Sequence, residues 1–364
     1  MIETLFHAYT PLLIWIGLGL LISRLVPDNF LKLLGQALYW VGVPLQLLVL
    51  GRQTDLSTGG LIPGVVIGIL VLSLVLALLI WWGWQWLISL KVQPEQQNLD
   101  LPVNGSFSSF ISIPDRDLSK SASTTVDGIT HLPTPDVLDS NEKDYNSLLR
   151  ASLGSFILAT ILGNTGFVGL TLTQVLTSSE NTNWAVLFTV TNNVVGTYGI
   201  AVLIASYFGR SQTQNHWWMQ LRDLVTVPSL WAFFFGLNTQ FVELPAVVES
   251  GLEQAVWVVI AFALLLVGLR LGTLKGWKNL EIASIASLLK VFIVPGLVGL
   301  GATYLGVTGE QRLVLVLMSG TPTGLSVLIL AEVYDLDRNL LASSIALTFV
   351  GLFLTLPLWL AWFG

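Results

Sequence analysis

The chain has 364 residues, of which 53% are hydrophobic and 10% charged, with a formal net charge of −6 and a mean hydropathy of +0.75. A soluble domain of this length could not cover so much apolar surface, so the composition indicates an integral membrane protein. The absence of cysteine excludes disulfides, thiolate catalysis and cysteine-ligated metals. The chain has only three histidines, His7, His131 and His216, all near the ends of apolar segments or in a loop, so we expect no metal site and no other cofactor.

Ten apolar segments are long enough to cross a hydrocarbon core of roughly 30 Å. Their approximate bounds are 5–23, 30–50, 61–90, 148–176, 183–208, 223–241, 246–271, 279–304, 311–333 and 339–362. No small-residue cleavage site follows the first segment, so we expect it to be retained as a span. The predicted fold is therefore an all-α integral membrane protein with ten transmembrane helices.

Residues 92–146 interrupt the series of apolar segments. They are rich in Ser, Pro, Asn and Asp, lack helical periodicity, and carry nine acidic residues against three basic ones. We predict a disordered loop between the third and fourth helices. We interpret its acidity as solvation, and the alternative is docking of a partner.

The placement of Lys and Arg predicts the orientation, because cytoplasmic connections retain these residues. With the N-terminus outside, the outer connections hold only Arg52 and Arg312. The thirteen on inner connections are Arg24, Lys32, Lys91, Arg116, Lys120, Lys143, Arg150, Arg210, Arg222, Arg270, Lys275, Lys278 and Arg338. We expect a multi-pass protein of the plasma (inner) membrane with both termini outside and the long loop inside.

The ten spans divide into two halves of five, residues 1–208 and 209–364. Five is odd, so the second half would enter the membrane from the opposite side, as inverted repeats of secondary transporters do. The fourth span contains GNTGFVGLT, Gly163 to Thr171, and the ninth contains SGTPTGLS, Ser319 to Ser326. Each motif lies in the fourth span of its half, which favours an internal repeat.

These two motifs predict locally unwound backbone, because Gly and Pro destabilise a helix interior. Freed backbone groups at membrane depth must face protein or a water-filled cavity, and paired breaks of this kind indicate a transport site. The half-helix after each break offers unpaired N–H groups and a positive dipole end, both suited to an anion. Candidate substrate-binding residues are Asn164, Thr165, Gly166, Thr321, Pro322 and Thr323. The alternative is that the small residues only allow close helix packing.

Lys290 lies midway along the eighth span, where an ammonium group is costly unless it is paired or hydrated. No Asp or Glu lies in the middle of any predicted span, so a bound carboxylate could be its partner. The alternative is that Lys290 snorkels or bonds backbone carbonyls near Pro295. Glu332 and Asp335, at the inner end of the ninth span, are candidates for gating.

Three amides also lie at membrane depth. Asn192 and Asn193 are in the fifth span, and Gln46 follows Pro44 in the second. Each could make a hydrogen bond between helices or form part of the substrate cavity. We include Asn192 and Asn193 among the candidate substrate-binding residues.

Several of these features resemble the auxin efflux carrier family, which includes plant PIN-type carriers and bacterial relatives described as malonate or malate permeases. They are the ten spans, the GNTGFVGL element, the charged residue ahead of Pro295, and SGTPTGLSVLILAEVYDLD from the ninth span onward. The resemblance implies two inverted five-helix repeats and a scaffold domain from the first, second, sixth and seventh spans. It also implies broken, crossing fourth and ninth helices that move organic anions by alternating access. Relatives commonly carry Pro where this chain has Thr171, and plant carriers place their long loop between the two halves.

We predict a secondary active transporter, an efflux carrier, for a small organic anion such as a mono- or dicarboxylate. One alternative is a membrane sensor that binds an organic anion and signals through the cytoplasmic loop, and another is a bicarbonate or bile-acid type symporter. An enzyme is not expected, because no HExxH, GxSxG or intramembrane carboxylate pair occurs. The expected partners are the anion and the lipid bilayer; a homodimer is possible, and nucleic acid is not expected.

Overall fold

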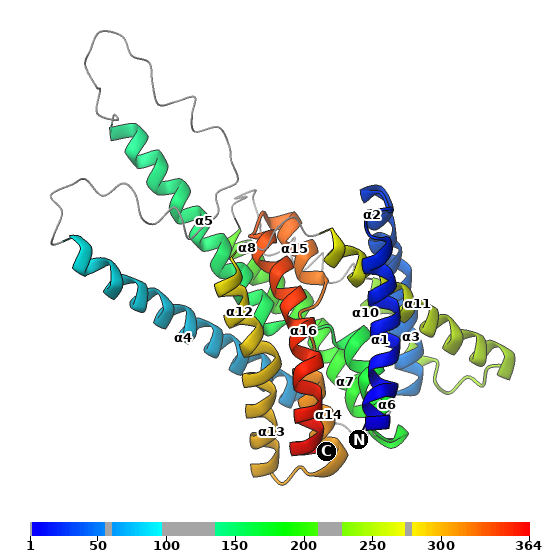
Figure 1. Ribbon diagram of the computed structural model, residues 1–364. Helices are drawn as coiled ribbons and strands as arrows, with labels where there is room; N and C mark the ends of the chain where they lie inside the picture. The colour runs from blue at the N-terminus through cyan, green and yellow to red at the C-terminus, as the bar shows by residue number, and fades with distance from the viewer. Residues whose placement is uncertain (1, 55–59, 97–134, 210–227, 274–278) are drawn as a thin grey trace.

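The computed structural model describes residues 2–54, 60–96, 135–209, 228–273 and 279–364. All regular elements in these ranges are helices, and β-pairing there is limited to one isolated bridge. The predicted all-α class is confirmed. The helices run from α1 to α16 along the chain, and π-helical turns labelled η interrupt several of them (Figure 1).

The first half contains α1 (Ile2–Ile22), α2 (Asp28–Ala37), η1 (Leu38–Gly42), α3 (Val43–Gln53), α4 (Ile62–Gln96), α5 (Pro135–Ile161), η3 (Thr165–Gly169), α6 (Leu170–Leu176), the 3-10 turn η4 (Ser179–Asn181), α7 (Thr182–Thr191), η5 (Asn192–Ala201) and α8 (Val202–Phe208). The second half contains α10 (Pro228–Asn238), α11 (Ala246–Gly272), α12 (Leu280–Leu288), η6 (Leu289–Ile293), α13 (Val294–Tyr304), α14 (Gly309–Ser319), α15 (Ser326–Tyr334) and α16 (Arg338–Phe363).

Within the described ranges, six helical runs are long and apolar enough to cross a membrane, and they match the second, third, fifth, seventh, eighth and tenth predicted spans. The fourth and ninth predicted spans are each divided into two shorter helical pieces, α5 with η3–α6 and α14 with α15. Their Gly- and Pro-containing motifs fall at the divisions, as helix propensity requires. The first span has a shorter apolar helix, Phe6–Ile22, and the sixth is described only from Pro228.

The predicted loop over residues 92–146 is shorter than expected. Helix α4 continues to Gln96 and α5 begins at Pro135, so both ends of that range are helical. A helix that is already formed propagates by one local hydrogen bond per residue and needs no apolar face to do so. Residues 97–134 lie outside the described residues.

The helices pack as two sets. Within the first set, here called the paired-helix set (α1, α2, η1, α3, α10 and α11), α1 packs against α11 and α3 against α10. The other described helices form the crossover set, in which α16 packs on α12 and α5, and α14 on α13 and α7. The paired-helix set corresponds to the first, second, sixth and seventh predicted spans. It meets the crossover set where α1 contacts α6 and α11 contacts η3.

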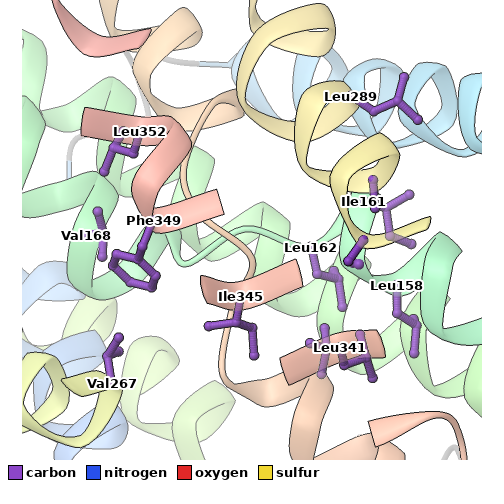
Figure 2. Packing of buried hydrophobic residues seen from close by; sticks show 14 of the residues in the cluster. Leu158, Ile161, Leu162, Val168, Val267, Leu289, Leu341, Ile345, Phe349 and Leu352 are labelled. Carbon is purple, nitrogen blue, oxygen red and sulfur yellow. The ribbon is translucent and has the colours of Figure 1, made fainter. Parts of the chain in front are cut away.

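The main core lies mostly in the crossover set and extends to Leu12 of α1 and Val267 of α11. Figure 2 shows Leu341, Ile345, Phe349 and Leu352 of α16 in a cluster that also includes residues of α5 and Leu289 of η6. All are nearly or fully buried. This packing holds the broken helices between α16 and their neighbours through close van der Waals contact, which favours helix association in a membrane.

Both termini lie at the same end of the bundle (Figure 1). The side chain of Tyr9 in α1 donates a hydrogen bond of 2.7 Å to the carbonyl of Phe353 in α16, close to the end of the chain. The side of the membrane on which they lie stays a prediction.

Candidate functional site

The two broken spans cross at their breaks. Gly163 and Thr323 form the isolated antiparallel bridge. On either side of it, the Asn164 amide donates to the Pro322 carbonyl at 2.7 Å, and the Gly324 amide donates to the Leu162 carbonyl at 3.2 Å. Backbone N–H and C=O groups that have no helical partner in one break are therefore hydrogen-bonded to the other break. Non-helical backbone at membrane depth requires such pairing.

The crossing is close because one of its residues has no side chain. A Cβ atom at Gly163 would overlap the Thr321 hydroxyl oxygen and would lie 3.1 Å from the Lys290 Nζ. Glycine at this position thus lets the fourth span, the ninth span and Lys290 meet at one point. The structure brings together the sequence candidates from three different spans.

The two threonines of the ninth-span break hold the crossover backbone. Thr321 donates to the Met318 carbonyl at 2.9 Å, and Thr323 donates to the Ala159 carbonyl at 2.8 Å. The Thr323 amide donates in turn to the Thr348 hydroxyl on α16 at 3.1 Å. Both hydroxyl hydrogens are engaged within the protein, so only lone pairs remain on these side chains for a ligand.

The fourth-span break opens the half-helix η3–α6. The Asn164 side chain caps it by accepting from the Phe167 amide at 3.3 Å, as N-cap asparagines commonly do. Asn192 on η5 donates to the Thr165 hydroxyl at 3.4 Å. Thus Asn164, Thr165 and Asn192 lie at one helix start. Asn193 is half-buried and makes no hydrogen bond with the residues that the structure describes.

Gln46 joins the two helix sets at membrane depth. Its side-chain amide, on α3, donates at 2.6 Å to the carbonyl of Gly166 in η3. Gln46 is buried, with 2% of its surface exposed. Of the two interpretations of this amide, the structure therefore supports the hydrogen bond between helices.

Lys290 is enclosed in the crossover set. It lies on the π-helical turn η6, which runs into Pro295 one turn later, and only 4% of its surface is exposed. No hydrogen bond or ion pair joins its Nζ to any residue within the described ranges. The turn packs against the end of α5, where Figure 2 shows Leu289 and Ile161 in the same cluster. A π-turn in a helix is often found at functional sites.

A cavity of about 540 Å³ lies between the two helix sets. Ser326, the first residue of α15, and Thr197 of η5 line its crossover side. The remaining lining residues are Lys32, Gly35, Gln36, Tyr39, Trp40, Tyr198, Val202, Pro228, Arg270, Ile329, Leu330, Glu332, Val333 and Tyr334. Lys290 does not line it. Lys290 lies on η6, which packs against α4, α5, α12, α13 and α16.

One gating candidate has an ionic partner. Glu332 on α15 lies 3.9 Å from the Arg270 guanidinium on α11, and both side chains line the cavity. Asp335 ends α15 in a left-handed conformation, with φ of 54°, and is exposed. Sequence reasoning missed Arg270 and the aromatic wall of Tyr39, Trp40 and Tyr198. In the sequence Arg270 is one of thirteen basic residues on inner connections, and nothing there pairs it with Glu332.

Comparison with known proteins agrees with this architecture. The sequence model of the membrane transport protein family, to which the auxin efflux carriers belong, matches residues 150–360, more than half of the chain. The chain belongs to the membrane transport protein family. The matched range of this family member contains both breaks and Lys290. An uncharacterized transporter of Methanocaldococcus jannaschii is 25% identical over 214 residues, which cover 57% of this chain and 67% of that relative. The protein is therefore a membrane transporter.

Proposed function

We propose that this membrane transport protein is a secondary active transporter of a small organic anion, such as a mono- or dicarboxylate. In this proposal the anion binds at the crossover of the two broken helices, and access to it alternates between the two sides of the membrane. The observation that carries the proposal is an unpaired, buried Lys290 at the point where the two breaks meet.

The helix directions support an anion. Helix α15 begins at Ser326 on the cavity wall, and η3–α6 begins at Thr165. Helix N-termini carry unpaired N–H groups and a partial positive charge. The Lys290 amine lies behind the same crossover and adds the only cationic group near it among the described residues. An anion at this point would meet favourable charge from three directions.

The packing supports two inverted repeats over residues 1–208 and 209–364. In such an arrangement the first span corresponds to the sixth, and the second to the seventh. The contacts between α1 and α11 then correspond to those between α10 and α3. The close contacts also correspond, because Gly19 and Gly268 lie at the first pair and Gly236 and Gly51 at the second.

Alternating access requires movement of the crossover set against the paired-helix set. Two contacts between the sets would change in that movement: the Gln46 hydrogen bond to Gly166, and the Arg270–Glu332 ion pair beside the cavity. We assign the ion pair, in the predicted inner half, as a gating contact. Asp335 stays a gating candidate without an ionic partner among the described residues.

The test is the thermal stability of the purified protein with acetate, succinate, malonate, bicarbonate and indole-3-acetate, each with and without sodium. A ligand at 100 times its dissociation constant should stabilise the folded protein by about 2.7 kcal/mol. We expect stabilisation by at least one carboxylate in the wild type and none in Lys290→Gln, whose fold should stay intact by circular dichroism. No shift with any anion in the wild type would contradict the proposal.

A further inference from the structure

Among the side chains that the structure describes, the surroundings of Lys290 contain no acidic partner. The elements packed against η6 are α4, α5, α12, α13 and α16. Among their described side chains, the titratable or charged ones are Arg150, Glu281, Tyr304 and Arg338. All four are exposed, whereas Lys290 is buried. Glu281 lies nine residues before Lys290, roughly 13 Å along a helix axis, which is too far for an ion pair.

Two helix ends among the described residues supply negative potential on the side of the amine that faces the crossover. Helix α5 ends at Ile161 and α14 ends at Ser319. Gly163 and Thr321 follow these ends by two residues, and a Cβ atom at Gly163 would contact both the Thr321 hydroxyl and the Lys290 Nζ. A helix C-terminus carries a partial negative charge of about half an elementary charge. The amine therefore faces partial charges and no full countercharge.

In this environment a bound ligand can change the protonation state of the Lys290 amine. Burial without a partner opposes the ammonium form, whereas the two helix ends favour it. A carboxylate at the crossover would add a full negative charge on the far side of Gly163. Because an opposite charge nearby favours the charged form, a bound anion shifts the amine to the ammonium form.

We propose that Lys290 carries the coupling ion of this transporter, and that this ion is a proton. When an anion enters, the neutral amine takes one proton from water and becomes the ammonium group, with no other bond made or broken. When the anion leaves on the opposite side, the amine returns the proton to water there. Proton and anion thus move together, and sodium is not required. This proposal rests on the proposed function and names its coupling partner.

The experiment measures proton uptake on anion binding to the purified full chain. Acetate, succinate and indole-3-acetate are titrated calorimetrically in Hepes and in Tris, whose ionisation enthalpies differ, at pH 6.0 and pH 8.5. The difference in heat between the two buffers reports the number of protons taken up per anion bound. By linkage we expect about one proton per anion at pH 8.5 and a much smaller uptake at pH 6.0.

Two variants make the result specific. Lys290→Arg keeps a permanent positive charge, so it should bind the same anion without proton uptake at either pH. Arg24→Gln removes an exposed cation far from the crossover and should keep the wild-type uptake. If Lys290→Arg does not fold, the pH dependence of the wild-type uptake decides, because equal uptake at pH 6.0 and pH 8.5 would overturn the assignment to Lys290.

The outcomes separate the two proposals. Anion binding by the wild type without proton uptake at either pH would overturn proton coupling and leave the anion transporter standing. Proton uptake that persists in Lys290→Arg would also overturn it, because another group would then carry the proton. No binding heat with any of the three anions would overturn the proposed function and, with it, the coupling.

Discussion

Gly163 shows how one residue sets the geometry of the candidate site. The atoms around it belong to the other broken span and to Lys290, and a Cβ atom there would lie 3.1 Å from the Lys290 Nζ. The same position also forms the backbone bridge to Thr323. The residue therefore serves both the crossing of the chains and the approach of the amine.

Gly163→Ala should lower both stability and anion binding. The added methyl group overlaps the Thr321 hydroxyl, and overpacking of this kind costs about 1–3 kcal/mol. The thermal midpoint and the anion-induced shift of the purified protein measure the two effects. Gly68→Ala is the matched control, because that glycine lies within α4 with nothing within 4 Å, and alanine there should be neutral or stabilising. Equal midpoints for the two variants would contradict the close crossing.

The Glu310 carboxylate makes a hydrogen-bonded contact at an exposed helix start, and we expect this contact to depend on pH. Its carboxylate accepts hydrogen bonds from the Ser178 hydroxyl at 2.6 Å, the Ser178 amide at 2.8 Å and the Asn181 side chain at 2.8 Å. These bonds, those from Ser178 first, lower the pKa of Glu310 below its ordinary value of 4.5. The contact ties the end of α6 to the start of α14.

Because the folded protein holds this carboxylate ionised, the contact stabilises the fold fully above about pH 4.5. The stabilisation should disappear as the pH falls through the lowered pKa of the folded state. We therefore expect the thermal midpoint of the wild type to be higher than that of Glu310→Gln at pH 7. This difference in midpoint should disappear in strongly acidic buffer. A difference in midpoint that does not change with pH would show that the charge of the carboxylate does not stabilise the fold.

At the level of helices, α1 and α11 show how glycine allows two backbones to touch. A Cβ atom at Gly268 would overlap the Ile16 carbonyl and would lie 2.9 Å from the Cα of Gly19. The two backbones thus touch without intervening side chains. In lipid, helix association depends on such van der Waals contact, since burial of apolar surface gives no net advantage over lipid tails.

Gly268→Val should separate α1 from α11 and lower the thermal midpoint, at a cost of about 1–3 kcal/mol for the overpacked contact. Gly251→Val is the control on the same helix, because no atom lies within 4 Å of a Cβ there. The measurement is the melting of both variants in the same detergent. If Gly268→Val and Gly251→Val had the same thermal midpoint, the close contact between α1 and α11 would be contradicted.

At the level of the whole molecule, the Arg270–Glu332 pair joins the two helix sets beside the cavity. The side chains are 27% and 44% exposed, so the pair contributes at most about 1 kcal/mol. An interaction of that size can bias a conformational equilibrium about fivefold without locking it.

Arg270→Glu should weaken the inner contact and raise the rate at which a cysteine at position 326 reacts with an impermeant maleimide, up to about fivefold. The natural chain has no cysteine, so Ser326→Cys is the only reactive site. The exchanged pair, Arg270→Glu with Glu332→Arg, should restore the original rate. If Arg270→Glu alone left the reaction rate unchanged, the Arg270–Glu332 pair would not be a gating contact.

The sequence by itself determined the all-α class, the membrane setting, the family and the two breaks, because these depend on composition and on local helix propensity. It also singled out Lys290, because a charge inside an apolar segment is visible without a structure. The ends of the predicted loop were wrong, because helix propagation into polar sequence leaves no apolar pattern.

Only the tertiary structure decided what these residues contact. It brings Gly163, Thr321 and Lys290 to one point, and it pairs Glu332 with Arg270. It also directs the Thr323 hydroxyl to the Ala159 carbonyl, and it leaves Lys290 out of the lining of the cavity. Such contacts join residues more than a hundred positions apart or on different helices, and their partners follow from the crossing of helices in space, which no local pattern encodes.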